Sequence, residues 1–275
     1  MRHLEEWRVS DGVQSVRDSW ISRSPPDKLG VTKRYVIFGE ARGWLLSQLE
    51  VPNHSLILDV GFGRGFLAFE SASAFEAHVV GIDFLGGEQV KIAIAGGRIA
   101  NLTNQISWVV GNAGAMPFRG VQFDAVISFN ALQDVVLTGG EEVLRRVLKE
   151  SLRVLRPGGV LAFADNGYPE SSLRQSQKLY ELIQRREFGV GLPTTRVVSN
   201  ELENQGLTNM TELRYDPSIS MDEKEAKIEI KDIVDARPFG KVFNFHSLWE
   251  DYARQISDTG LSYPEVLLIM GKRKE

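Results

Sequence analysis

From Ser55 onward the chain alternates short apolar runs with longer stretches whose apolar residues recur every three or four positions. The runs, bounded by Gly or Asp, predict buried strands, and the longer stretches predict amphipathic helices. We predict strands at 56–60, 78–82, 106–110, 123–128 and 160–164, with helices at 66–75, from the second strand to about 100, and at 140–155. This alternation is typical of βαβ units around a parallel sheet.

The second half continues the pattern less regularly. It predicts helices near 171–188 and 199–206 and strands at 210–215 and 265–270. The stretch 216–262 is too long for a hairpin loop, so we interpret it as a cap insertion whose charge-rich start is a solvated helix. Residues 1–54 predict a separate helical segment. We therefore expect an N-terminal helical cap at 1–54 and a main domain at 55–275 that contains the insertion 216–262.

The amino-acid composition excludes several kinds of site and partner. The 275 residues contain no cysteine, which excludes disulfides, thiolate-bound metals and a cysteine nucleophile. Lys and Arg number 32 against 36 Asp and Glu, a net charge of −4, which disfavours non-specific binding to nucleic acid. The first ten residues lack a signal-peptide pattern, and no run of about 18 apolar residues occurs, so we expect a cytoplasmic protein without membrane contact.

The strongest motif is a glycine-rich turn after the first strand. The strand 56–60 carries Asp59 and runs into Gly61-Phe62-Gly63-Arg64-Gly65. Glycines there let the backbone approach a ligand closely and turn into a helix whose N–H groups face that ligand. A dinucleotide-binding loop has G-x-G-x-x-G or A, but Phe66 stands at the third glycine position here.

Two later strand ends carry polar residues at the same edge of the sheet. Asp83 ends the second strand, where a carboxylate can accept hydrogen bonds from both hydroxyls of a ribose. Asn112 and Ala113 follow the third strand, where an amide side chain and the next backbone N–H can bind the edge of an adenine. These positions predict an adenosine-containing ligand.

Together these segments resemble the class I S-adenosylmethionine-dependent methyltransferases, most closely the small-molecule group with a methyltransferase domain. The matching blocks are D-x-G-x-G-x-G at 59–65, G-N-A with P-F at 111–118, F-D-x-V at 123–126 and L-R-V-L-x-P-G-G at 152–159. The resemblance covers about 55–165. It implies an α/β fold with a doubly wound, seven-stranded, mostly parallel sheet, strand order 3-2-1-4-5-7-6, and the seventh strand antiparallel.

The resemblance also implies roles for the cofactor, S-adenosyl-L-methionine, and its product S-adenosyl-L-homocysteine. Asp59 orients the glycine loop and the methionine ammonium, and Gly61 and Gly63 make close backbone contacts. Asp83 holds the ribose and Phe84 packs on the adenine. Asn112 and Ala113 bind the adenine edge, although the family often has Asp where Asn112 stands. Phe129 offers its carbonyl oxygen to the ammonium.

Candidates for the acceptor pocket come from strand ends and from the caps. They are Tyr35, Asn130, Gln133, Asp165, Tyr168 and His246. His246 is a candidate general base because imidazole is a common proton acceptor in catalysis, but a histidine among aromatic residues is also typical of simple packing. We therefore assign no catalytic residue. The histidines have no partners at metal-ligand spacing, so we predict no metal.

These observations favour a methyltransferase that acts on the O, N or C atom of a small molecule by in-line displacement. The base-stacking motif D/N-P-P-Y/F is missing after the fourth strand, which argues against nucleic acid as the acceptor. Three alternatives remain: a tRNA or protein methyltransferase, a catalytically silent cofactor-binding partner subunit, and a nicotinamide-dependent oxidoreductase.

Overall fold

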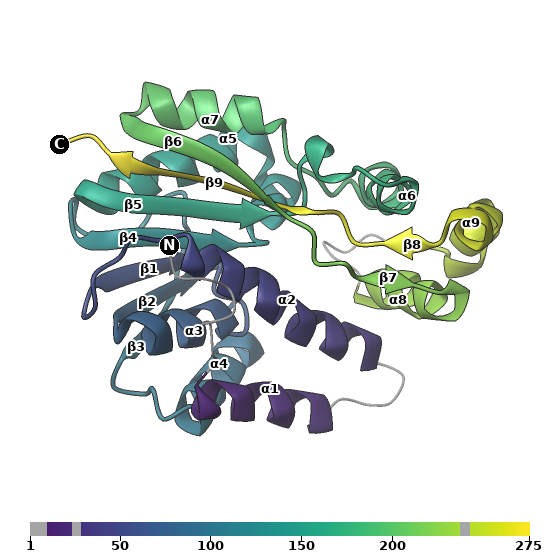
Figure 1. The fold of residues 1–275 in the computed structure, drawn as a ribbon, viewed down its shortest axis with the longest axis horizontal. Helices are drawn as coiled ribbons and strands as arrows, with labels where there is room; N and C mark the ends of the chain where they lie inside the picture. The colour runs from purple at the N-terminus through teal and green to yellow at the C-terminus, as the bar shows by residue number, and fades with distance from the viewer. Residues whose placement is uncertain (1–9, 24–28, 237–242) are drawn as a thin grey trace.

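A seven-stranded sheet runs through the molecule and carries helices on both faces (Figure 1). This computed structural model describes residues 10–23, 29–236 and 243–275, with the backbone alone at 21, 23, 29–37 and 236. The strands of the sheet are β1 (Leu56–Val60), β2 (His78–Asp83), β3 (Ile106–Val110), β4 (Phe123–Phe129), β5 (Leu155–Asp165), β6 (Leu207–Tyr215) and β9 (Val266–Arg273).

The strand order is β3-β2-β1-β4-β5-β9-β6. The strands from β3 to β5 pair in parallel, whereas β9 is antiparallel to both β5 and β6. Because β9 is the seventh strand of this sheet in chain order, the order and the antiparallel strand are as predicted. Successive strands are added on one side of β1 as far as β3 and then on its other side from β4, and ligands bind at such a switch point in open α/β sheets.

Helices cover the sheet and extend beyond it. They are α1 (Asp11–Arg23), α2 (Leu29–Ser47), α3 (Phe66–Phe75), α4 (Glu88–Ile99), α5 (Leu132–Val154), α6 (Gln175–Ile183), α7 (Thr195–Asn204), α8 (Glu223–Ala236) and α9 (Phe245–Thr259). A short 3₁₀ turn, η3 (Pro169–Ser171), precedes α6, and a π-helical turn, η4 (Gln184–Phe188), follows it.

Alternate residues along the strands enter two separate cores. On β1, Ile57 belongs to the core beneath α1, α2 and α3, and Leu58 belongs to the core beneath α5 and α7. Val126 and Ile127 on β4 divide in the same way. Because side chains of a strand point alternately to opposite faces, both faces of these strands are apolar, as a parallel sheet covered on both sides requires.

Two element boundaries differ most from the sequence-based prediction. Helix α5 begins at Leu132, not near residue 140, and contains a non-helical Gly140 with φ 72°. Strand β5 begins at Leu155, not at residue 160, and includes the Arg-Pro-Gly-Gly segment. A register irregularity opposite Phe123 and a left-handed Gly158 (φ 71°) absorb the extra residues, so a turn-like sequence forms a bulged strand end.

The insertion forms a layer beyond the carboxyl ends of the parallel strands (Figure 1). Its short strands β7 (Ser220–Met221) and β8 (Leu261–Ser262) pair with each other, and α8 and α9 lie between them in the chain. Helix α8 was expected to be exposed to solvent, but Ala226, Glu229 and Ile230 on one of its faces are buried. One face of α8 therefore packs against the rest of the protein.

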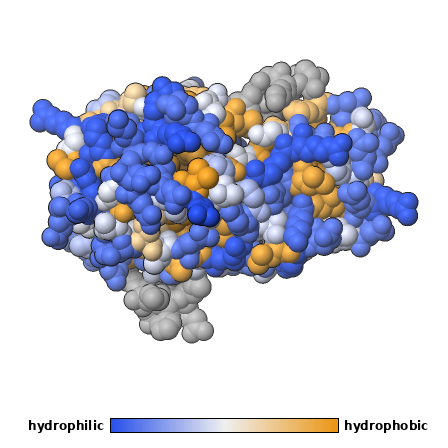
Figure 2. All heavy atoms as spheres, turned by 90° about the horizontal axis from the view of Figure 1, so that it is seen from above, coloured by the Kyte–Doolittle hydropathy of each residue, from blue (hydrophilic) through white to orange (hydrophobic). Residues whose placement is uncertain are grey.

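On the face that Figure 2 shows, apolar side chains lie in small groups among hydrophilic ones. Within the described parts of the chain, none of the helices combines the length and the apolar character needed to cross a membrane.

Candidate active site

One cavity of about 940 Å³ opens at the carboxyl ends of the parallel strands. Its walls come from the β1–α3 turn, the ends of β2, β3 and β4, the first half of α5, and helices α2, α6 and α8. All eight residues predicted to contact the cofactor line it, namely Asp59, Gly61, Gly63, Asp83, Phe84, Asn112, Ala113 and Phe129. Residues from consecutive βα units thus meet in one space.

The glycine turn brings bare backbone to the cavity. Gly61 has φ 77°, its N–H donates to the Ile82 carbonyl (2.8 Å), and a Cβ there would lie 2.3 Å from Ala131 Cβ. Gly63 has φ 51°, and a Cβ there would meet no atom within 4 Å. Gly61 is therefore required by packing, whereas Gly63 leaves open space for a close ligand.

Asp83 fastens this turn to the end of β2. Its Oδ2 accepts from the Gly63 N–H (2.8 Å) and its Oδ1 accepts from the Leu85 N–H (2.9 Å). The carboxylate is 8% exposed, whereas the neighbouring Phe84 side chain is 58% exposed. An oriented carboxylate beside an uncovered aromatic ring suits a ligand that has hydroxyls next to a flat ring.

Asn112 begins the turn after β3. Its Oδ1 accepts from the Gly114 N–H (2.8 Å), which holds the side chain in a fixed orientation at the cavity wall. An amide oxygen has two lone pairs, and the amide nitrogen has two donors. The side chain therefore keeps both kinds of hydrogen-bonding group for a ligand.

Asp59 is a buried carboxylate, 1% exposed, on β1. Burial, reinforced by the negative charge of Asp83, raises its pKa to about 8, and the Arg42 guanidinium partly opposes this rise. Among the described residues, no group donates a hydrogen bond to its Oδ2. A buried, unsatisfied acceptor is costly, so this oxygen suits a ligand that brings a donor or a positive charge.

The end of β4 is joined to the end of β5. Asn130 has φ 51°, and its Oδ1 accepts from the Asn166 N–H (3.1 Å). Gln133 donates to the Asn166 side chain (3.4 Å). Asn130 and Gln133, both predicted as pocket residues, line the cavity beside Phe129.

The other predicted pocket residues lie elsewhere. Asp165 is fully buried and accepts from the N–H groups of Leu132 (3.1 Å) and Gly167 (2.8 Å), so it caps α5 rather than lining the cavity. Burial raises its pKa to about 7. Tyr168 is also fully buried and outside the cavity wall. His246 is exposed in the first turn of α9 and does not line the cavity. The Tyr35 side chain lies outside the described residues.

A buried ion cluster joins the N-terminal helices to α3. The Glu70 carboxylate accepts from Arg42 Nε (2.7 Å) and Nη2 (2.9 Å) and from Arg17 Nη2 (2.6 Å). Glu70 and both arginines are less than 9% exposed, and Arg42 lines the cavity. Sequence reasoning missed this cluster because each residue, taken alone, looks like an ordinary surface charge.

Sequence reasoning also missed a second buried carboxylate, on the inner face of α8. Glu229 Oε1 accepts from the hydroxyls of Tyr180 (3.0 Å) and Tyr263 (2.5 Å), and both tyrosine rings line the cavity. Asp232 and Ile233, one turn further along α8, line it as well. The insertion therefore contributes directly to the site.

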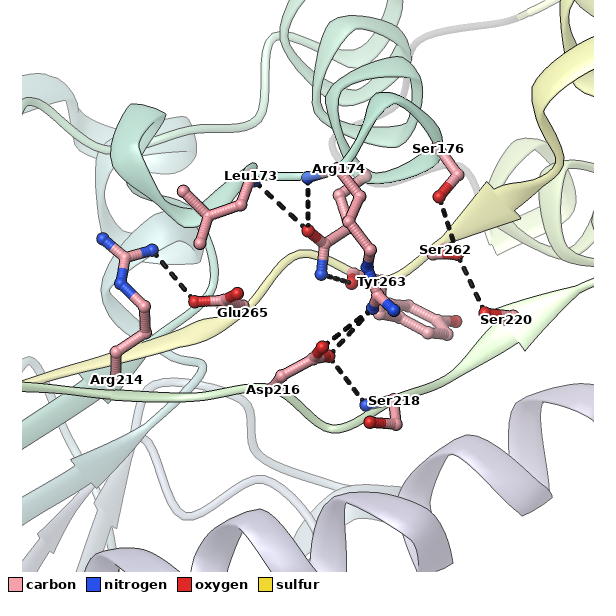
Figure 3. A network of polar contacts seen from close by, with 11 residues as sticks. Leu173, Arg174, Ser176, Arg214, Asp216, Ser218, Ser220, Ser262, Tyr263 and Glu265 are labelled. Carbon is pink, nitrogen blue, oxygen red and sulfur yellow. Dashed lines mark hydrogen bonds and ion pairs between the residues drawn. The ribbon is translucent and has the colours of Figure 1, made fainter.

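Tyr263 is fixed by the polar network in Figure 3. Buried Gln177 donates to the Tyr263 carbonyl (3.1 Å). The preceding Ser262 hydroxyl contacts the hydroxyls of Ser176 (3.0 Å) and Ser220 (3.1 Å). These contacts join α6, β7 and β8, so the position of this ring is set by three separate segments.

Arg64 of the glycine turn contacts the N-terminal helices. Its guanidinium lies 4.2 Å from the centre of the Trp20 ring, a cation–π geometry, and the residue lines the cavity. In the described stretches, no three His, Asp or Glu side chains gather as a metal site would require.

Comparison with known proteins gives a family for the centre of the chain. Residues 57–159 match the family model described as "Methyltransferase domain". "Sterol methyltransferase-like 2" of Botryococcus braunii is 29% identical over 188 residues, which are 68% of this chain and 46% of that protein. "2-phytyl-1,4-naphtoquinone methyltransferase" of Thermosynechococcus vestitus is 33% identical over 135 residues, 48% of this chain and 56% of that protein.

The chain spans about half the length of the curated relatives it matches. Among solved structures, phosphoethanolamine N-methyltransferase 2 of Haemonchus contortus, in complex with S-adenosyl-L-methionine, superimposes with a TM-score of 0.59 at 19% identity. The match covers 95% of this chain and 60% of that one. At this identity the likeness shows a common fold.

Proposed function

We propose that this chain is a class I, S-adenosylmethionine-dependent methyltransferase that methylates a small-molecule acceptor, because its residues 57–159 match the methyltransferase domain family and its curated relatives are named methyltransferases. The observation that carries the proposal is the convergence of Asp59, Asp83 and Asn112 around the bare backbone of Gly63 in one cavity. We name these four residues, with Gly61, the cofactor end of the cavity.

The residues at the cofactor end fit the cofactor chemically. The unsatisfied Oδ2 of Asp59 suits the methionine ammonium, because a cation would both donate a hydrogen bond and favour the ionised carboxylate. Asp83 has lone pairs left for two ribose hydroxyls, and the exposed ring of Phe84 would stack on the adenine. Asn112 and the Ala113 N–H would bind the adenine edge.

When bound, the cofactor supplies a methyl group activated on a sulfonium. The task of the protein is then to hold the acceptor atom in line with that methyl group and to exclude water. Orientation of this kind supplies roughly 7–11 kcal/mol of a reaction barrier. The layer of α6 and α8 over the strand ends serves this purpose, since Tyr180, Ile233 and Tyr263 close the cavity on that side.

The acceptor binds, in this proposal, beyond the cofactor end. We name this region, lined by Phe38, Tyr180, Asp232 and Tyr263, the acceptor end. It is built from α2 of the segment 1–54 and from parts flanking or within the insertion 216–262, so these caps select the acceptor. A cavity of about 940 Å³ has room for a cofactor and a small molecule.

Calorimetric titration with S-adenosylhomocysteine, NAD and NADP tests the proposal. We expect binding of S-adenosylhomocysteine alone, weakened at least about tenfold by Asp83→Ala, because each hydrogen bond to a charged group contributes about 1.5–3 kcal/mol. Asp124→Ala, in a carboxylate that bonds Leu56 N and Arg156 away from the cavity, is the matched control and should bind normally. Binding of a nicotinamide nucleotide without S-adenosylhomocysteine would contradict the proposal.

A further inference from the structure

Two asparagine side chains meet where the ends of β4 and β5 reach the cavity. Asn130 Oδ1 accepts from the Asn166 backbone N–H (3.1 Å), and Asn166 Oδ1 accepts from Gln133 Nε2 (3.4 Å). Because a backbone N–H can only donate, the atom of the Asn130 amide that is left over is the nitrogen. The same holds for Asn166 in its contact with Gln133. We name Asn130 and Asn166 the amide pair.

The nitrogens of the amide pair face the open space of the cavity. Both residues line it, and both are only half-buried. Within the part of the chain that the structure describes, no group accepts a hydrogen bond from either amide nitrogen. An amide nitrogen carries two hydrogens and no formal charge. The pair therefore offers neutral donors to a ligand.

The backbone around the amide pair is held in place. Asn130 has a left-handed conformation (φ 51°), and its side chain bonds the start of the next segment at Asn166. Beside Asn166, the Gly167 carbonyl accepts from Arg185 Nη2 (2.6 Å) and from the Leu192 N–H (2.8 Å). Donors that are already fixed lose little conformational freedom when a ligand binds, which favours affinity.

A row of four aromatic rings lines the same cavity. Phe38 contacts Phe129 with ring centres 5.7 Å apart and Tyr263 at 5.4 Å, and Tyr263 contacts Tyr180 at 4.8 Å. Neighbouring rings are tilted by 51–69°, and a flat ring packs favourably against such a wall through edge-to-face contacts. Phe129 directly precedes Asn130 in the chain, which brings one end of this aromatic row next to the amide pair.

The tyrosines of the aromatic row provide ring surface rather than donors. Both hydroxyls donate to Glu229 Oε1 on α8. A phenol has one O–H hydrogen, so Tyr180 and Tyr263 have none left for a ligand. In this part of the cavity the aromatic row thus contributes flat apolar surface, and the amide pair contributes the hydrogen-bond donors.

We propose, on the basis of the methyltransferase function proposed above, that the acceptor is a hydroxyarene, a flat aromatic ring that carries a hydroxyl group. An N–H donor needs a lone pair, which a hydroxyl oxygen has and an ammonium ion lacks. The ring lies along the aromatic row, and the hydroxyl oxygen accepts hydrogen bonds from Asn130 Nδ2 and Asn166 Nδ2.

This placement suits transfer to oxygen. The hydroxyl loses its proton to water, which leaves a negative oxygen with three lone pairs. Two of these pairs accept from the amide pair, whose fixed donors stabilise the charge. The third forms the O–CH₃ bond as the S–CH₃ bond breaks, with the electron pair of the broken bond left on sulfur. The products are an aryl methyl ether and S-adenosylhomocysteine.

Three probes of similar size separate the ring from the oxygen. Phenol has both, toluene has the ring alone, and cyclohexanol has the hydroxyl alone. The protein is first saturated with S-adenosylhomocysteine, and the binding of each probe is then measured by NMR titration. We expect phenol to bind about fivefold more tightly than toluene, because of the hydrogen bonds, and about fivefold more tightly than cyclohexanol, because of the ring contacts.

Two variants locate the hydrogen bonds. Asn166→Leu replaces one amide by an apolar side chain of similar size, and Asn130→Gly removes the other without straining the left-handed backbone. In each variant the preference for phenol over toluene should fall from about fivefold to less than twofold, with toluene binding retained. Asn204→Leu, in an exposed asparagine at the end of α7 outside the cavity, is the control and should keep the preference.

The outcomes separate this inference from the proposed function. If S-adenosylhomocysteine binds but phenol binds no better than toluene or cyclohexanol, the hydroxyarene inference is wrong and the methyltransferase proposal stands. If S-adenosylhomocysteine itself does not bind, both fail. An unchanged preference for phenol in Asn166→Leu and Asn130→Gly would overturn the role of the amide pair. The comparison of the three probes on the wild-type protein decides the inference even where a variant does not fold.

Discussion

At the cofactor end of the cavity the wall comes from β1 and from the strand ends and turns of β1, β2 and β3, whereas at the acceptor end it comes from helices α2, α6 and α8 and from Tyr263 before β9. The first region depends on left-handed glycines and on one carboxylate that holds two N–H groups. The second depends on a buried glutamate that holds two tyrosines. Changes at one end should therefore leave the other largely intact.

The largest expected effect is a loss of stability at the buried cluster of Arg17, Arg42 and Glu70, which joins α1 and α2 to α3. Glu70→Ala leaves Arg17 and Arg42 buried without their carboxylate, and breaking a buried pair this way costs about 3–5 kcal/mol of unfolding free energy. Urea denaturation measures it. The control Glu88→Ala removes an exposed pair with Lys91 and should cost less than about 1 kcal/mol. Equal losses in the two variants would show that the attachment of α1 and α2 to α3 does not depend on this cluster.

Two glycines of the same turn should respond differently. Gly61→Ala combines left-handed strain with a clash against Ala131, so we expect a loss of roughly 2–4 kcal/mol. Gly63→Ala carries only the strain, about 1–2 kcal/mol, because the space beside it is open. It should nevertheless weaken S-adenosylhomocysteine binding more than tenfold, as the added methyl enters the cavity. Normal binding by Gly63→Ala would contradict the close backbone approach.

A substitution at Glu229 should change the acceptor end without changing the cofactor end. Glu229→Ala removes the acceptor of two tyrosine hydroxyls, and we expect a loss of about 2 kcal/mol, with Glu229→Gln smaller because its side-chain oxygen remains. Calorimetry on both variants should give an S-adenosylhomocysteine affinity within about twofold of wild type. A large drop would mean that the two ends are coupled.

Asp59 should make stability depend on pH. Because its pKa is raised to about 8, the folded protein keeps a proton that the unfolded chain loses above about pH 4. This contribution to stability is fully present below about pH 4 and declines as the pH rises to about 8. Asp59→Asn should remove the decline, which denaturation at several pH values can measure. An identical slope in the variant would contradict the raised pKa.

The same carboxylate predicts a smaller effect on binding. A ligand ammonium beside Asp59 favours its ionised form, so binding of S-adenosylhomocysteine near pH 7 should release up to about one proton. Calorimetry in buffers of different ionisation enthalpy detects this release. The release should be absent in Asp59→Asn; release of the same size there would assign the proton to another group.

Sequence reasoning grouped the residues of the proposed cofactor end because they lie at the ends of β1, β2 and β3 and in the turns that follow. Gly61 and Gly63 follow a strand directly, and Asp83 and Asn112 end the next two strands, so periodicity alone places them at one edge. The same logic gave the wrong environment for Asp165. It does end a strand, but its oxygens are used to cap α5, and only the packed structure shows that.

The acceptor end could not be found in this way. Tyr180, Glu229 and Tyr263 are separated by more than 30 residues each and become neighbours only through the packing of α6 and α8. Glu229 sits in a charge-rich helix whose composition predicts solvent exposure. Its burial follows from the apolar face made by Ala226 and Ile230, a pattern that is visible in the sequence but easily outweighed by the surrounding charges.

A crystal structure with S-adenosylhomocysteine tests the central claim most directly. The account predicts the ligand in the cavity at the strand ends, with its ribose hydroxyls on the Asp83 carboxylate, its ammonium at Asp59 and its adenine beside Asn112. A ligand bound elsewhere, or one that contacts neither carboxylate, would contradict the account.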